Sequence, residues 1–106
     1  MPKYLISASY SAEGLRGLQK DKASGRRSAL NAAVEGAGGK VECVYFALGQ
    51  DDVYTIVDMP DNASVTALGI AASATGLVHT RTTALLTVEE VDQALLKSVN
   101  YSAPGG

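Results

Sequence analysis

The fold of this chain is decided by residues 49–60, which read GQDDVYTIVDMP. The stretch begins with a glycine turn and two carboxylates, and it continues as a run of β-branched and aromatic residues that is typical of a β-strand. We place this strand at Asp52–Met59, and Pro60 ends it just before a new helix. The preceding run, Val41–Leu48, has the same strand character, so the two strands are expected to pair as a hairpin.

Two further strand patterns flank this hairpin. Lys3–Tyr10 alternates two sets of side chains, and Leu77–Leu86 is dense in β-branched residues. After the second of these strands, Thr87 and Glu90 have the residue types and the spacing of a capping box. A short helix is therefore predicted to follow.

Helical patterns lie between the outer strands and the hairpin. The first begins after a Ser11 N-cap, and its apolar spacing is interrupted at Ser24-Gly25. The second begins at Asp61 or Asn62 and ends at Gly76. Because this second helix is rich in Ala, Ser and Gly, it is expected to pack closely against its neighbour and to carry few reactive groups.

The predicted order of elements is β-α-β-β-α-β followed by a short helix, which is the ferredoxin-like arrangement of the α+β class. Its antiparallel sheet would have the strands in the spatial order 4-1-3-2, with both long helices on one face. Residues 1–100 would form this single domain. Residues 101–106 would be a disordered tail, because they have nothing to bury.

The hairpin strands are apolar on both faces. One alternating set contains Val44, Phe46 and Val57, and the other contains Tyr45 and Ile56. The helices would cover only one face, so the other would expose apolar side chains unless a second sheet covered it. We therefore expect the sheets to pair between subunits of a homodimer or a higher homo-oligomer.

The composition excludes several classes of partner. Eleven acidic and nine basic side chains give a net charge of −2, which offers no attraction to nucleic acid or to anionic lipid. No apolar run approaches the roughly 18 residues that cross a bilayer, and the N-terminus has a strand pattern rather than that of a signal peptide. The single cysteine, Cys43, cannot form an internal disulfide. A cytoplasmic location is expected.

The candidate chemical groups are few. His79 is the only histidine, and on a regular strand it shares a face with Arg81. In the crevice between sheet and helices, such a pair would bind a carboxylate or an enolate and transfer a proton. Alternatively, both side chains lie in solvent or at an interface.

The adjacent carboxylates Asp51 and Asp52 would point to opposite faces, so they do not form a general acid and base pair. Asp51 is expected to shape the turn by accepting from nearby backbone amides. Asp52 would orient a neighbouring side chain or cap the hairpin, and Tyr54 shares its face. The candidate catalytic residues are His79, Arg81, Tyr54 and Asp52.

No cofactor is expected. One histidine and one cysteine do not make a zinc site, and the glycines at Gly14, Gly17 and Gly25 do not form a phosphate-binding loop. The basic residues of the first helix, which include Arg26 and Arg27, are interspersed with acids and indicate a solvated face.

Three stretches of the chain resemble the GYD domain family: residues 44–61, 81–91 and 3–10. The resemblance implies a member of the dimeric α/β-barrel superfamily, in which ferredoxin-like subunits pair their sheets. The usual family signature is Gly-x-Tyr-Asp, whereas this chain has Gly49-Gln50-Asp51-Asp52. Any role of the family tyrosine therefore does not transfer, and the resemblance implies a fold rather than a reaction.

Two functions remain open at this stage. The first is a small oligomeric protein that binds a small metabolite in a pocket between sheet and helices, without catalysis. The alternative is a cofactor-independent enzyme of the monooxygenase, isomerase or cyclase type, which acts on a small enolisable or aromatic metabolite.

Overall fold

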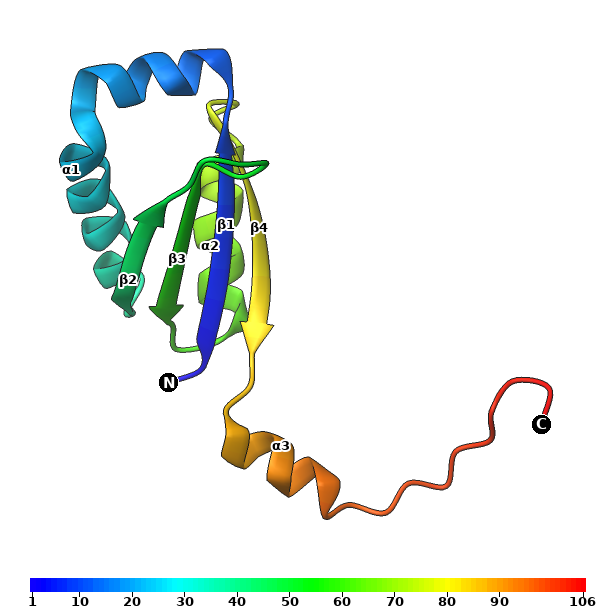
Figure 1. Cartoon of the computed structure of the whole chain (residues 1–106). Coiled ribbons are helices and arrows are strands. Elements are labelled where there is room, and N and C mark those ends of the chain that lie inside the picture. Colours follow the sequence, from blue (N-terminus) through cyan, green and yellow to red (C-terminus); the bar gives the residue numbers. More distant parts are fainter.

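The computed structural model describes residues 1–106, which form four strands and three helices (Figure 1). In chain order these elements are β1 (Lys3–Tyr10), α1 (Ala12–Gly36), β2 (Lys40–Phe46), β3 (Val53–Asp58), α2 (Asn62–Ser73), β4 (Val78–Leu85) and α3 (Val88–Leu95). The predicted order of elements is confirmed. The bounds of the hairpin strands and of β4 differ from the predicted bounds by one or two residues at each end, because strand ends are the least sharply defined part of a sequence pattern.

The four strands form one antiparallel sheet in the order β2-β3-β1-β4, which is the predicted order 4-1-3-2 read from the other edge. The fold is α+β and ferredoxin-like. Both long helices lie on one face of the sheet, and no element of the chain covers the other face (Figure 1). The hairpin of β2 and β3 contains a register shift between Val41 and Cys43.

The buried core lies at one end of the space between sheet and helices. It contains the start of β1, the end of β3, the last turns of α1 and the first turn of α2, and its members are Tyr4, Ile6, Val34, Val57, Met59 and Val65. The hydroxyl of Tyr4 donates to Oδ1 of Asn62 at 2.5 Å, which links β1 to the start of α2. Packing at this end fixes the two helices on the sheet.

Helix α1 consists of two segments that meet at a sharp corner (Figure 1). At the corner Lys22 has φ 66° and ψ 166°, a conformation that breaks the helix and that L residues rarely adopt. The break lies two residues before the predicted interruption at Ser24-Gly25. The segment after the corner packs along the sheet, whereas the segment before it crosses the end of the molecule.

The first segment of α1 approaches the chain before β4 closely at Gly14. A Cβ atom built on Gly14 would lie 2.0 Å from the backbone oxygen of Leu77, so only glycine fits there. Ser11 caps the helix and also donates from its backbone N–H to the Leu77 oxygen at 2.9 Å. These contacts hold the start of α1 against the end of the sheet.

The C-terminal part of the chain extends away from the body (Figure 1). The predicted capping box of Thr87 and Glu90 is present and begins α3. No residue of α3 is buried. The exposed apolar side chains of this region are Val88, Val91, Leu95, Leu96, Val99 and Tyr101.

Candidate functional site

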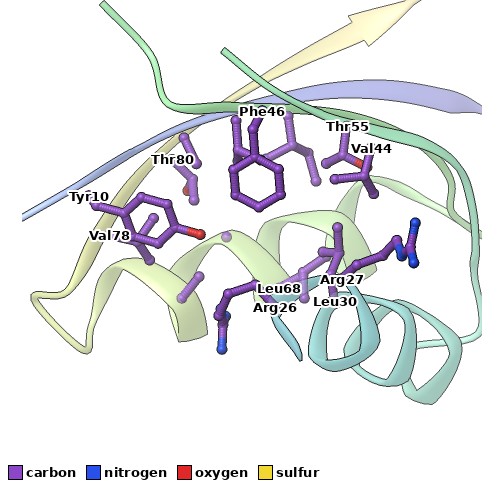
Figure 2. A pocket seen from close by; sticks show the side chains of 15 residues that line it. Tyr10, Arg26, Arg27, Leu30, Val44, Phe46, Thr55, Leu68, Val78 and Thr80 are labelled. Atoms are coloured by element: carbon purple, nitrogen blue, oxygen red, sulfur yellow. The ribbon is translucent and has the colours of Figure 1, made fainter. Parts of the chain in front are cut away.

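A cavity of about 110 Å³ lies between the sheet and the two long helices (Figure 2). It occupies the end opposite the buried core, next to the second half of β1 and the corner of α1. Ten of its fifteen lining residues are hydrophobic. The side chains that form its walls are Ile6, Ala8, Tyr10, Leu30, Val44, Phe46, Val53, Leu68 and Val78.

The cavity exists because small residues replace large ones along the same faces. On β1 the buried side chain changes from Tyr4 and Ile6 in the core to Ala8 at the cavity. On α2 the core contact is Val65, whereas Gly69 and Ala72 line the cavity. The Ala-, Ser- and Gly-rich helix was expected to pack closely, but here its small residues leave space.

The cavity wall contains three hydroxyl groups, of which two are already engaged. Thr55 donates to the backbone oxygen of Cys43 at 2.8 Å, and the Thr80 hydroxyl bonds that of Ser73 at 3.1 Å. The hydroxyl of Tyr10 has no hydrogen-bond partner in the protein and points into the cavity (Figure 2). Tyr10 is therefore the polar group that the cavity offers to a ligand.

Two arginines of α1 lie at the rim of the cavity (Figure 2). Arg26 lies 3.6 Å from Asp21, measured from Nη1 to Oδ2, and Arg27 has no carboxylate within 4.0 Å. Sequence reasoning placed both on a solvated face, which agrees with the exposure of Arg27, but it did not place either residue beside a cavity. Their spacing from the inward-facing Leu30, four and three residues earlier, is the helical signal that indicates a position beside the cavity.

The four candidate catalytic residues predicted from the sequence do not line this cavity. Ser7 of β1 pairs with both Tyr54 and Arg81, and Ser9 pairs with His79. Directly paired residues share a sheet face, and the odd-numbered residues of β1 point away from the helices. Tyr54, Arg81 and His79 therefore lie on the open face, and His79 is exposed without a hydrogen bond or an ion pair.

Part of this set meets around Asp51. The carboxylate of Asp51 is buried, with 6% of the residue exposed, and it accepts hydrogen bonds from the Arg81 guanidinium and from the Tyr54 hydroxyl. Asp52 instead accepts from the backbone N–H of Tyr10 at 2.8 Å. The expected roles are thus reversed, because the turn directs Asp51 over the open face and Asp52 toward the end of β1.

Two ionisable groups have clearly shifted pKa values, and both lie away from the cavity. Hydrogen bonds from Lys3 to Glu42 and then to Asp58 raise the pKa of Lys3 to about 12. Hydrogen bonds from Ser64, first from its backbone and then from its side chain, lower the pKa of Asp61 at the N-cap of α2. These groups stabilise strand ends and a helix start.

The remaining ionisable side chains are dispersed over the structure. No three side chains of His, Cys, Asp or Glu gather closely enough to hold a metal ion. None of the helices combines the length and the apolar character that a membrane crossing requires. The cavity wall itself contains no carboxylate and no imidazole.

Comparison with known proteins agrees with the resemblance seen in the sequence. The family model for the GYD domain matches residues 4–95, which include all three helices, every strand apart from the first residue of β1, and the whole cavity. A comparison with the curated proteins and with the solved structures finds no significant match. The matched range is most of the 106 residues, and the chain therefore belongs to the GYD domain family.

Proposed function

We propose that this protein binds a small metabolite in the cavity between its sheet and its helices, and that it works as a homo-oligomer. The observation that carries the proposal is the cavity itself, which is apolar, partly open and bordered by a few polar groups. Small-molecule sites in proteins have this character. No catalytic step is part of the proposal.

The apolar walls of the cavity supply a driving force for binding. Apolar ligand surface that moves from water to these walls contributes about 25 cal/mol per Å² removed from water.

The size of the cavity indicates the size of the ligand. An engineered protein cavity of about 150 Å³ holds benzene. A cavity of about 110 Å³ with an open side would therefore accept one ring, or a short branched chain, with the rest of the molecule at the mouth.

The test is a nuclear magnetic resonance titration of the whole chain with phenylacetamide, a neutral one-ring probe. We expect the amide signals of Ala8, Gly69 and Val78 to shift in a saturable manner. The matched control is Ala72→Leu, in which a larger side chain fills the cavity from α2. Equal shifts in both proteins, or none in either, would count against the proposal.

Self-association is supported by the open sheet face. Tyr45 is 70% exposed and Tyr54 is 38% exposed, and they pair directly on the open face. Leu5, Cys43 and Ile56 extend the same face. A second copy of the chain that packed its own open sheet face there would bury this apolar surface between the two sheets.

Catalysis on the open face is a second candidate function, which the contacts of Asp51 with Arg81 and Tyr54 favour. A second subunit would enclose these groups and His79, and the reaction would need no cofactor. A natural ligand that shifts the imidazole signals of His79, and not the signals of the cavity, would favour this function over the first.

A further inference from the structure

We infer that the cavity ligand is a small organic acid, with a one-ring or branched apolar body and a single anionic group at the rim. The inference rests on the proposed binding function and adds the chemical class of the ligand. In this arrangement the positive charge of Arg26 and Arg27, at the two exits of the cavity, attracts the anion, and the Tyr10 hydroxyl, which borders the same exit as Arg26, donates a hydrogen bond to it.

The interior of the cavity requires an apolar body. Its walls are aliphatic and aromatic side chains, and the hydroxyls of Thr55 and Thr80 are already hydrogen-bonded. A polar group placed among these walls would lose its hydration without finding a partner. The polar part of the ligand must therefore lie where Tyr10 and the arginines are.

The two arginines occupy two different exits of the cavity. Arg26 also borders the adjoining space under the first segment of α1, together with Tyr10 and Asp21. Arg27 also borders the opening beside Val44 and Phe46. A ligand that enters by either route passes a guanidinium group.

The charge at the rim is unbalanced. Asp21 is the only acidic residue that lines the cavity or these two adjoining spaces, and it faces two arginines. The 3.6 Å separation of Arg26 and Asp21 is too long for a hydrogen bond, and Arg27 has no ion pair at all. The rim therefore has a net positive charge and unused guanidinium donors that suit a carboxylate.

The corner at Lys22 explains why both arginines can reach the rim. It turns the chain so that the second segment of α1 begins next to the cavity, and Arg26 and Arg27 lie in its first turns. Leu30, one turn later, anchors this segment on the sheet and lines the cavity. The bases of the two arginine side chains are thereby held by a packed helix.

The experiment compares phenylacetate with phenylacetamide, which has the same shape and no charge, on the whole chain by nuclear magnetic resonance titration. We expect phenylacetate to bind about tenfold more tightly, because hydrogen bonds to charged groups are the stronger ones. In Arg27→Gln and in Arg26→Gln this preference should fall several-fold, while the affinity for phenylacetamide stays unchanged. Tyr10→Phe should weaken binding of the acid more than that of the amide.

The matched control is Arg16→Gln, because Arg16 lies on the same helix, pairs with Glu13 and does not line the cavity. It should keep the full preference for the acid. Equal affinities for acid and amide in the unchanged protein would overturn the inference and leave the binding function intact. A preference that survives both arginine substitutions would also overturn it, and binding of neither probe would overturn the inference and the proposed function together.

Discussion

The buried carboxylate of Asp51 contacts the guanidinium of Arg81, a residue that is thirty positions away in the sequence and 57% exposed at its side chain. The contact joins the turn after β2 to the edge strand β4, and it spans β1 because Ser7 lies between Tyr54 and Arg81 in the sheet. Asp51 stands where the family signature has a tyrosine. In this chain that position holds the turn on the sheet through charge.

The two partners of this contact should respond unequally to substitution. Arg81→Leu leaves a buried carboxylate with only the Tyr54 hydroxyl as a side-chain partner, so we expect a loss of about 1 to 3 kcal/mol in unfolding free energy. Asp51→Asn leaves an arginine that water can solvate, so its loss should be about 1 kcal/mol or less. Urea unfolding of both variants measures the difference.

Lys3 gives the stability of the protein a dependence on alkaline pH. Its pKa is raised to about 12 by Glu42 and Asp58, so the folded state holds this proton more tightly than the unfolded state does. The contribution of Lys3 is complete below a pH of about 10.5, its ordinary value, and is lost as the pH rises through about 12. In Lys3→Gln, urea midpoints measured across this window should fall less steeply than in the unchanged protein.

The control for this measurement is Lys20→Gln, since Lys20 is exposed on α1 and takes part in no ion pair. It should keep the slope of the unchanged protein. An unaltered slope in Lys3→Gln would mean that the two carboxylates do not hold the proton of Lys3.

The fold was predictable because its signals are local. The alternation in Lys3–Tyr10, the capping box at Thr87 and the hairpin stretch each depend on residues close together in the chain, and their order then leaves one topology. The corner of α1 at Lys22 was placed two residues late, because Ser24-Gly25 is the stronger breaker by composition. The backbone instead turns at Lys22, and Leu30 in the segment after the turn packs against the core.

The candidate site was harder to predict, because it depends on which face each strand presents. A shift of one residue moves a side chain to the other face of the sheet. The sequence placed His79 and Arg81 on the same face, as the structure does, but it did not decide which of the two faces this is. The cavity has no sequence motif. It arises from the small side chains of Ala8, Gly69 and Ala72, which meet only in three dimensions.

Narrowing the cavity at Gly69 should stabilise the protein and weaken binding. A Cβ atom on Gly69 would lie 3.5 Å from the Thr80 hydroxyl oxygen, which is ordinary contact, so Gly69→Ala fits without strain. Alanine also favours the helix by about 1 kcal/mol relative to glycine. We expect a gain of about 1 kcal/mol in unfolding free energy, measured by urea unfolding.

The matched control for this substitution is Gly17→Ala, because a Cβ atom on Gly17 meets nothing within 4 Å and Gly17 does not line the main cavity. It should share the gain from helix propensity and leave phenylacetamide binding unchanged. Weaker probe binding in Gly69→Ala alone would assign the binding site to this cavity, and equal binding in the two variants would place the probe elsewhere.

The open sheet face should hold two copies together. Tyr45 and Tyr54 pair across β2 and β3 at its centre, so Tyr45→Lys would place an ammonium group in the middle of a paired-sheet interface. Sedimentation velocity at micromolar concentration should show a dimer or larger assembly for the unchanged protein and a monomer for Tyr45→Lys. The control is Leu48→Lys, because Leu48 is fully exposed in the turn after β2 and lies outside the strand pairing. A monomer in the unchanged protein would contradict sheet pairing, and a Tyr45→Lys protein that stays assembled would assign the interface to another surface.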